Sequence, residues 1–308
     1  MILTYIIKEN EKNKTLKDIL KNKLYISTKS LTNLKQNGGI TVNDKNVNVT
    51  YIVNTNDRIK VDFSKKTKTK PSFLDKFEIV NKKINILYED EYLLVVNKDI
   101  NTPIHPSANN YTNTLSNYVA YYLKKQNIDG IHIITRLDKN TSGICIFTKN
   151  EYIQELFTRK KEDINLTKEY IAIVNNIIKV DHDVITKKIA RKKDSIITRE
   201  INEQEGEFAK TEFFVLKRNY NKNYTVVKLI LHTGRTHQIR VHMLSIGHIL
   251  LGDDLYAKEY NIKNISKYIT RQALHAYKVS FNHPITNKKI EIIAKIPEDM
   301  NKLIKNDS

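Results

Sequence analysis

The chain has 308 residues, which is enough for one sizeable folded core and one smaller module. Its 52 lysines and arginines exceed its 34 aspartates and glutamates, and the net charge of +18 favours a polyanionic partner such as a nucleic acid. A single cysteine, Cys145, excludes an intrachain disulfide, and no apolar run approaches the roughly 18 residues of a membrane helix. Because the sequence also shows no signal-peptide pattern, we expect a soluble, cytoplasmic protein that does not act at a membrane.

The amino-terminal part of the chain predicts two helices followed by a small group of strands. Thr15 is suited to cap the first helix, because apolar residues follow it at helical spacing. A second helix around residues 31–34 is expected to end at the pair Gly38-Gly39. Apolar residues then alternate with polar ones over residues 40–49 and 59–61, which is the period of β-strands.

A basic stretch separates this part from the rest of the chain. Residues 64–70 contain four lysines and no apolar side chain, which is typical of a solvated tether. We therefore expect a small domain over residues 1–63, a basic linker over residues 64–82 and a larger domain over residues 83–300.

The larger domain predicts strands and helices in irregular alternation. Helices are expected after Thr114 and Asn150, because both residues are suited to cap the apolar stripes that follow them. The expected strands are residues 84–88, 92–98, 170–174, 213–216, 225–231 and 290–293. Because several strands follow one another directly, the sequence favours an α+β fold with a mixed, mostly antiparallel sheet over a doubly wound fold.

Two polar blocks in the larger domain carry the chemical information. The first runs from Arg136 to Gly143 as Arg-Leu-Asp-Lys-Asn-Thr-Ser-Gly, between two apolar segments that are expected to be strands. Alone it is typical of an ordinary hairpin turn, because short polar side chains bond their own backbone there. The second block, over residues 231–243, reads Leu-His-Thr-Gly-Arg-Thr-His-Gln-Ile-Arg-Val-His-Met. Only nine of the 52 basic residues are arginine, and Arg136, Arg235 and Arg240 lie in these blocks, which indicates a need for a planar charged group.

Together the two blocks resemble the RluA-like family of RNA pseudouridine synthases, whose signature Arg-Leu-Asp-x-x-Thr-Ser-Gly is matched at every fixed position. The resemblance covers nearly all of residues 84–297 and implies the same α+β fold. It also implies an isomerase that converts specific uridines of large-subunit rRNA or tRNA to pseudouridine without a cofactor. The amino-terminal domain is similar, more loosely, to the small RNA-binding module named after ribosomal small-subunit protein four.

In this family the aspartate of the first block is catalytic, so the resemblance implies that Asp138 is the catalytic residue. A carboxylate can act on the ribose as nucleophile, base or electrostatic partner without a metal ion. Inside a pocket it stays ionised only if a cation compensates for lost water, and the family pairs it with the arginine that matches Arg240. We expect Arg240 on a helix capped by Thr236 and closed by Gly247. Tyr170 matches the family's tyrosine, which packs on the uracil and is a candidate to help remove the proton from carbon 5.

Five further residues are expected to contact RNA. Arg136 is expected on the same strand face as Asp138, and it resembles the family's arginine that fills the base stack when the target uridine flips out. The other four are Arg235, His237, Gln238 and Lys98. From the sequence alone, Arg235, His237, Gln238 and also His242 are suited either to line the pocket or to bind RNA.

No metal ion and no nucleotide cofactor are expected. The histidines at positions 237, 242 and 248 lack the His-x-x-x-His spacing of a helical zinc pair, and neither of the phosphate-binding glycine motifs occurs. RNA is the expected partner, and we expect the protein to be a monomer.

Two other functions stay open from the sequence alone. A non-catalytic RNA-binding protein is disfavoured because Asp138, Tyr170 and Arg240 are all present. A glycosidase-like hydrolase would need a second carboxylate, for which Asp253 is the candidate. Departures from the family pattern bear on loop geometry and substrate choice more than on the reaction. They are Asp99, Asn101, Thr135, Ile249 and Ala257.

Overall fold

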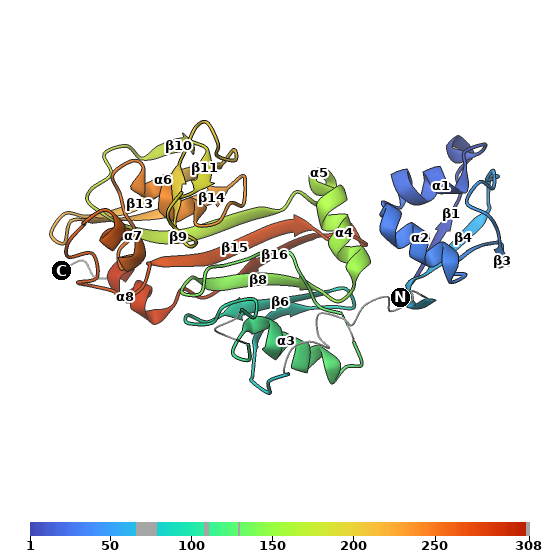
Figure 1. Ribbon diagram of the computed structural model, residues 1–308, viewed down its shortest axis with the longest axis horizontal. Helices are drawn as coiled ribbons and strands as arrows, with labels where there is room; N and C mark the ends of the chain where they lie inside the picture. The colour runs from blue at the N-terminus through green and yellow to red at the C-terminus, as the bar shows by residue number, and fades with distance from the viewer. Residues whose placement is uncertain (66–78, 108–110, 129, 306–308) are drawn as a thin grey trace.

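The computed structural model describes residues 1–65, 79–107, 111–128 and 130–305. It contains two bodies, each with its own sheet (Figure 1). The smaller body is formed by the first 65 residues, and the larger body follows in sequence after the predicted basic linker. Most of that linker lies outside the described residues.

The smaller body is a four-stranded antiparallel sheet with helices packed on it. The strands, in the order β1-β4-β2-β3, are β1 (Ile2–Ile6), β4 (Arg58–Asp62), β2 (Ile40–Val42) and β3 (Lys45–Asn46). The helices are α1 (Leu16–Asp18), which continues as a π-helical turn over Ile19–Lys23, and α2 (Thr28–Gln36). The predicted cap of the first helix is confirmed, because the Thr15 hydroxyl accepts a hydrogen bond from the N–H of Asp18.

Two expectations for the smaller body are wrong. The first element is a strand, β1, which pairs along its whole length with β4, so the helices are inserted between strands and do not precede them all. Val47 and Val49 lie outside β3, and they pack against the hydrophobic core without pairing. Their alternation with polar residues therefore reflects burial of one side of a loop, which has the same period as a strand.

The larger body is built on a ten-stranded sheet. Its main path is β10-β13-β14-β9-β15-β8-β6-β5, with β16 paired to β15 and β7 paired to β8. All of these pairings are antiparallel except the one between β15 and β8. The strands are β5 (Asn85–Glu89), β6 (Leu93–Lys98), β7 (His132–Ile133), β8 (Ser142–Thr148), β9 (Thr167–Asn175), β10 (His182–Thr186), β13 (Lys210–Asn219), β14 (Tyr224–Leu231), β15 (Leu274–Asn282) and β16 (Lys289–Ile293). The predicted α+β class with a mixed, mostly antiparallel sheet is confirmed.

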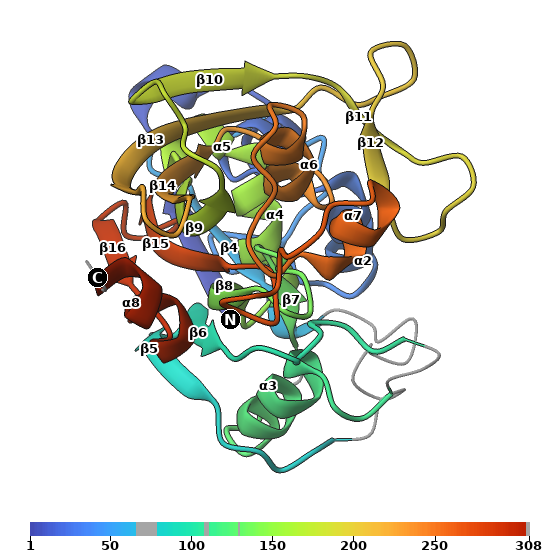
Figure 2. The same ribbon diagram turned by 90° about the vertical axis from the view of Figure 1, so that its left-hand side faces the viewer.

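Helices and a short ribbon flank this sheet. The helices are α3 (Leu115–Lys124), α4 (Glu151–Arg159), α5 (Lys161–Ile164), α6 (Gln238–Leu244), α7 (Asp254–Glu259) and α8 (Glu298–Lys305). The predicted caps are confirmed, because the side chains of Thr114 and Asn150 accept backbone N–H bonds from the first turns of α3 and α4. The ribbon, β11 (Ile189–Arg191) with β12 (Arg199–Ile201), lies beside α7 (Figure 2).

Strand β15 is central to the sheet, although it was not among the expected strands. Its first three residues, Leu274 to Ala276, are buried between β9 and β8. Beyond them, polar residues at positions 278, 280 and 282 alternate with apolar ones, which is the period of a β-strand, so the sequence carried a strand signal that was missed. The ribbon and β10 were also not predicted, because their residues are mainly polar or charged.

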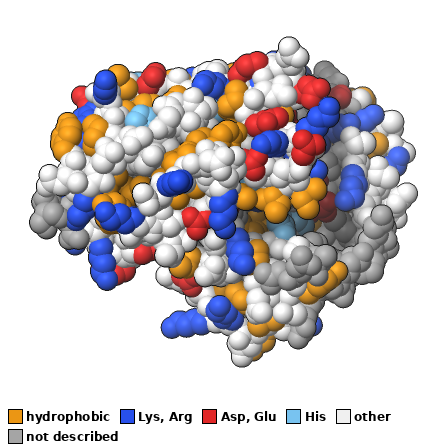
Figure 3. Space-filling view, turned by 60° about the vertical axis from the view of Figure 1, so that its left-hand side comes forward, with side chains coloured by type: hydrophobic (Ala, Val, Ile, Leu, Met, Phe, Trp, Pro, Cys, Tyr) orange, Lys and Arg blue, Asp and Glu red, His pale blue; other side chains and the backbone are white. Residues whose placement is uncertain are grey.

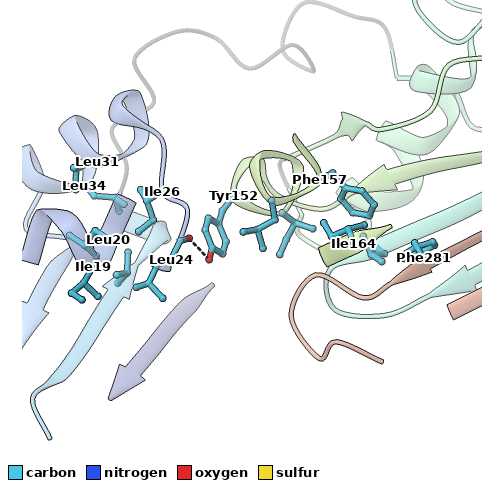
Figure 4. Close-up of a cluster of buried hydrophobic side chains, with 14 of the residues drawn as sticks. Ile19, Leu20, Leu24, Ile26, Leu31, Leu34, Tyr152, Phe157, Ile164 and Phe281 are labelled. Carbon is cyan, nitrogen blue, oxygen red and sulfur yellow. Dashed lines mark hydrogen bonds between the residues drawn. The ribbon is translucent and has the colours of Figure 1, made fainter. Parts of the chain in front are cut away.

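The two bodies share one hydrophobic core, which extends from the smaller body through α4 to strands β6, β8, β15 and β16 of the larger sheet (Figure 4). Tyr152 of α4 donates its hydroxyl to the carbonyl of Leu24 at 2.9 Å and stacks on Phe63 with ring centres 4.6 Å apart. Glu155, one turn further along α4, accepts the backbone N–H of Ser27 at 3.1 Å and the Ser30 hydroxyl at 2.9 Å. The smaller body is therefore packed on the larger one through both apolar and polar contacts.

Candidate active site

Asp138 lies in an irregular loop over residues 134–141, between β7 and β8. The expectation that Arg136 and Asp138 share a strand face is therefore wrong. The loop is tied to the sheet at its start, because the Thr135 hydroxyl accepts the N–H of Ile146 at 2.9 Å. At its end Gly143 has φ +111°, and a Cβ there would lie 2.2 Å from the carbonyl oxygen of Ala276, so only glycine allows β8 to approach β15 at this point.

Arg240 is on α6, as expected, but the helix begins differently. Its N-cap is His237 in the left-handed conformation, with φ +56° and no side-chain capping bond, so the predicted cap by Thr236 is wrong. The regular helix ends at Leu244, and the turn that follows contains Gly247 at φ +84°. From the first turn of this helix the Arg240 side chain reaches the Asp138 loop.

The Arg240 guanidinium connects two carboxylates. Its Nε and Nη2 atoms each donate to Asp253 at 2.7 Å, and its Nη1 donates to Oδ2 of Asp138 at 3.1 Å. The Arg240 and Asp253 side chains are 5% and 1% exposed, whereas that of Asp138 is 26% exposed. Burial alone would lower the pKa of Arg240, but its hydrogen bonds to Asp253 and the charges of both carboxylates raise that pKa above its usual range. Asp253 therefore fixes the position of the Arg240 guanidinium.

A tyrosine and a histidine complete this arrangement. The guanidinium lies 4.8 Å from the ring centre of Tyr256, a cation–π distance. The Tyr256 hydroxyl accepts the backbone N–H of Arg199 at 3.0 Å and lies 2.9 Å from Nδ1 of His237. If the hydroxyl donates to Nδ1, neutral His237 carries its proton on Nε2, which lies 3.7 Å from Oδ2 of Asp138. Burial lowers the pKa of His237, which favours this neutral form.

Tyr170 approaches the same space from β9. Its side chain is buried, and burial raises the pKa of its phenol above the usual range, so the hydroxyl stays protonated at neutral pH. A cavity of about 60 Å³ lies between Tyr170 and the Asp138 loop. The candidate residues that line this cavity are Asp138, Tyr170, Arg240, Arg136, Arg235, His237 and Gln238.

Lys98 is the one candidate residue that does not line the cavity. It is 1% exposed, and its ammonium group donates to the carbonyl oxygens of Asp99, Thr102 and Lys139 at 2.8, 2.9 and 2.9 Å. Burial lowers the pKa of Lys98 to about 8. Because all three donors are used inside the protein, this placement does not favour the expected contact with RNA. The bond to Lys139 instead fixes the residue that follows Asp138.

Gln238 and Arg235 organise the loop before α6. The Gln238 amide donates to the carbonyl of Lys210 and the hydroxyl of Thr211, and its oxygen accepts the backbone N–H of Arg235 at 2.9 Å. The Arg235 guanidinium is partly exposed and pairs with Glu207. Gln238 is therefore placed to support the cavity, while Arg235 lies at its rim.

Two residues of the site were not found from the sequence. Asp253 was considered only as a second catalytic carboxylate, and its role as the partner of Arg240 is set by a contact that no local pattern reveals. The glycine before it was a usable signal, because Gly252 has φ +71° and a Cβ there would lie 2.0 Å from the carbonyl oxygen of Arg271. Tyr256 gave no signal, since it is one of 17 tyrosines.

Comparison with known proteins agrees with this geometry. The model of the RNA pseudouridylate synthase family matches residues 92–245, and the model of the RluD ribosomal pseudouridine synthase N-terminal domain matches residues 3–59. The chain belongs to the RNA pseudouridine synthase family. An RNA pseudouridine synthase of Bacillus subtilis strain 168, YjbO, is 33% identical over 92% of this chain and 96% of its own length. The ribosomal large subunit pseudouridine synthase D of Zymomonas mobilis is 36% identical over 72% of each protein.

Solved structures support the fold of this RNA pseudouridine synthase. Human RNA pseudouridylate synthase domain containing 1 matches 74% of this chain and 86% of its own, with 24% identity and a TM-score of 0.55. The predicted family, fold class and isomerase activity are confirmed. The likeness of the smaller body to the module of ribosomal small-subunit protein four stays a prediction. Within the described ranges, no helix is long and apolar enough to span a membrane.

Proposed function

We propose that this pseudouridine synthase modifies specific uridines of large-subunit ribosomal RNA, as a cytoplasmic monomer, with Asp138 as its catalytic residue. Relatives that are 33–36% identical over about 72–74% of this chain are named ribosomal large subunit pseudouridine synthase D. The net charge of +18 suits an RNA partner, and lysine and arginine side chains are spread over the face shown in Figure 3. Transfer RNA is the alternative substrate.

One observation carries the assignment of Asp138. Its Oδ2 atom is held by Arg240 at 3.1 Å, while Oδ1 has no hydrogen bond or ion pair with any described residue. A carboxylate in this state is paired with a buried cation and still has one oxygen free to face a ribose. Asp253 lacks this property, because both of its oxygens are bonded to Arg240.

The reaction needs no group from outside the substrate. The bond between ribose C1′ and uracil N1 breaks, and Asp138 either adds to C1′ or stabilises its positive charge. The detached uracil turns so that C5 faces C1′, and a C1′–C5 bond forms. C5 then loses its proton and N1 gains one, so that the product is an isomer of the substrate. If Asp138 has added to C1′, it is released when the new bond forms.

Tyr170 and Arg136 act on the base in this proposal. A buried phenol with a raised pKa is a poor proton acceptor, so packing of the Tyr170 ring on the uracil is favoured over removal of the C5 proton. Arg136 is exposed at the rim of the cavity and has no partner among the described residues. Its guanidinium is free to occupy the space that a flipped uridine leaves in the RNA stack, which lowers the cost of flipping.

The smaller body completes the proposal. We assign residues 1–63 to an RNA-binding domain resembling that of ribosomal small-subunit protein four, residues 64–82 to a basic linker and residues 83–300 to the catalytic domain. The shared core around Tyr152 supports a fixed position for the smaller domain on the catalytic one. RNA bound to both domains would then meet one continuous surface.

The test is release of tritium from carbon 5 of uridine in unmodified ribosomal and transfer RNA. Wild-type protein should release tritium from large-subunit rRNA, and Asp138→Asn should release none while binding the same RNA. Release from tRNA alone would overturn the substrate assignment. Equal release by Asp138→Asn would overturn the catalytic role of Asp138, and formation of an abasic site would indicate hydrolysis instead.

A further inference from the structure

A second, larger cavity adjoins the cavity at Asp138. Its volume is about 480 Å³, and it lies between α4 and α5 on one side and the segment after β14 on the other. Leu231, the last residue of β14, lines both cavities, so the two spaces are neighbours that share this side chain as a wall. We call the larger one the side cavity. Its walls include the apolar side chains of Ile134, Phe157 and Leu166.

Lys168 brings a positive charge into the side cavity. It precedes Tyr170 by two positions on β9, so both side chains are on the same face of the sheet, with Cα atoms about 7 Å apart at the rise of a strand. The ammonium group lies beside the loop after β14, since a Cβ on Gly234 would be 3.6 Å from Nζ of Lys168. Lys168 is thus the neighbour, on the same face of β9, of the Tyr170 ring that is proposed to contact the uracil.

Among the described residues, this lysine has no partner of its own. In the part of the chain that the structure describes, Lys168 makes no hydrogen bond and no ion pair, although it is only partly exposed and burial lowers its pKa. Two other lysines of low exposure are paired: Lys98 donates to three carbonyls, and Lys149 lies 2.8 Å from Glu89. A partly buried ammonium without a partner is unfavourable in the free protein, so its position suits an anion supplied by a ligand.

We propose that Lys168 binds a backbone phosphate next to the target uridine and that the side cavity holds the nucleotide flanking that uridine. This inference rests on the proposed function, because it takes the base at Tyr170 as its reference point. The distance between Tyr170 and Lys168 matches a step of one nucleotide along an extended strand. Phe157 and the aliphatic walls provide apolar surface for a base, which is how unpaired nucleotides are held in RNA-binding sites.

The experiment compares full-length Lys168→Met, which removes the charge and keeps an unbranched side chain, with Lys168→Arg, which keeps the charge. Lys124→Met, on the exposed end of α3, is the control for the loss of one positive charge. Binding to an unmodified large-subunit rRNA transcript is measured from low to high KCl, and thermal unfolding of the free proteins is measured alongside. Lys168→Met should weaken binding about tenfold and make the slope of log K against log salt shallower by about 0.7 to 0.9.

Lys168→Arg should retain most of the affinity, and Lys124→Met should keep the wild-type slope. The Tm of free Lys168→Met should not fall, because no internal partner is lost. A lower Tm together with weaker binding would show that Lys168 supports the fold, and an unchanged slope in a folded Lys168→Met would show that it binds no phosphate. Either result overturns the proposal.

A second measurement places the phosphate. The uridine mapped by tritium release is synthesised in short RNAs whose flanking phosphates are replaced one at a time by uncharged methylphosphonates. One flanking replacement should weaken wild-type binding but leave Lys168→Met unaffected, since the partner is already absent. Equal losses of affinity in wild type and Lys168→Met would show that Lys168 does not bind the replaced phosphate. If wild type forms no pseudouridine, the proposed function fails on its own, and if wild type is active with no coupling to Lys168, only this inference fails.

Discussion

Replacement of Asp253 by asparagine tests whether the reaction depends on how Arg240 is held. In the wild-type protein two bonds of 2.7 Å to Asp253 occupy Nε and Nη2, which leaves Nη1 to reach Asp138 at 3.1 Å. Asp253→Asn keeps the size of the side chain, but it removes the charge and turns one acceptor into an N–H donor. A guanidinium has only donors, so one of the two bonds must be lost and the group must turn.

The structure sets the size of the effect. Loss of one partner from a buried ion pair costs about 3 to 5 kcal/mol in the free energy of unfolding. We expect the lower end, about 3 kcal/mol, because the amide oxygen still accepts one bond and Asp138 still neutralises Arg240. This loss corresponds to a fall in Tm of up to about 10 °C. Displacement of a group in the reacting assembly by about 1 Å lowers the rate about 100-fold, so the single-turnover rate should fall by about two orders of magnitude.

Two assays decide the matter. Single-turnover tritium release at saturating protein gives the rate of the reaction, and thermal unfolding followed by circular dichroism gives Tm. Asp254→Asn, at the exposed next position of α7, is the matched control and should change neither value greatly. If Asp253→Asn unfolds earlier yet reacts at the wild-type rate, Asp253 only stabilises the fold and the reasoning about Arg240 is wrong. An unchanged Tm would contradict the stated energy of the buried pair.

Three further changes test the surroundings of the site. Tyr170→Phe removes only the hydroxyl, so tritium release should stay within about tenfold of wild type if the ring packs on uracil, whereas loss of a general base costs about 100-fold or more. Burial lowers the pKa of His275 from 6.5 to about 4, so the unfolded chain takes up the proton first as the pH falls. The contribution of neutral His275 to the free energy of unfolding is therefore full above pH 6.5 and declines toward pH 4 by about 1.4 kcal/mol per pH unit. Urea denaturation at several pH values should show this decline in wild type and not in His275→Gln. Glu155→Ala removes the acceptor of the Ser27 and Ser30 bonds and should lower the free energy of unfolding by about 1 to 3 kcal/mol in the same assay.

Each of these expectations has a contradicting outcome. Complete loss of release in Tyr170→Phe would assign the C5 proton to the phenol. An identical acid dependence in His275→Gln would mean that other groups set the stability below pH 6.5. Wild-type unfolding of Glu155→Ala, judged beside the exposed control Glu162→Ala, would show that the polar contacts between the two bodies contribute nothing measurable.

The features that the sequence predicted correctly are decided by near neighbours in the chain. Thr15, Thr114 and Asn150 each cap a helix through a bond to the residue three positions further on, so a short window contains the whole interaction. Thr236 fits the same local pattern, but the prediction that it caps α6 was wrong. The left-handed backbone of His237 fixes the start of α6, and contacts of Gln238 with β13 help to hold it, which a local window does not contain.

The candidate site likewise contains residues that sequence patterns identified and contacts that only the fold reveals. The two motif blocks identified six residues that line one cavity, and a separate family match identified the seventh, Tyr170, because the family pattern records their joint use. Lys98 was grouped with the RNA-binding residues, but sequence does not show that a lysine will be 1% exposed. The partnership of Arg240 and Asp253 was missed for a related reason, since an aspartate near an arginine in sequence is common and only the fold shows which pairs are buried.

Buried cations hold the Asp138 loop from three sides. Lys98 at the end of β6 donates to the carbonyl of Lys139, Arg271 before β15 donates to the carbonyl of Asn140 at 3.3 Å, and Arg240 on α6 holds Asp138 itself. Each is 5% exposed or less, so none of the three is placed to bind RNA on the surface. Arginine and lysine therefore serve two purposes in this chain. A few buried groups fix the geometry of one loop in advance, which lowers the reorganisation needed during the reaction. In our proposal Arg136 and Lys168, which have no partner among the described residues, bind the substrate instead.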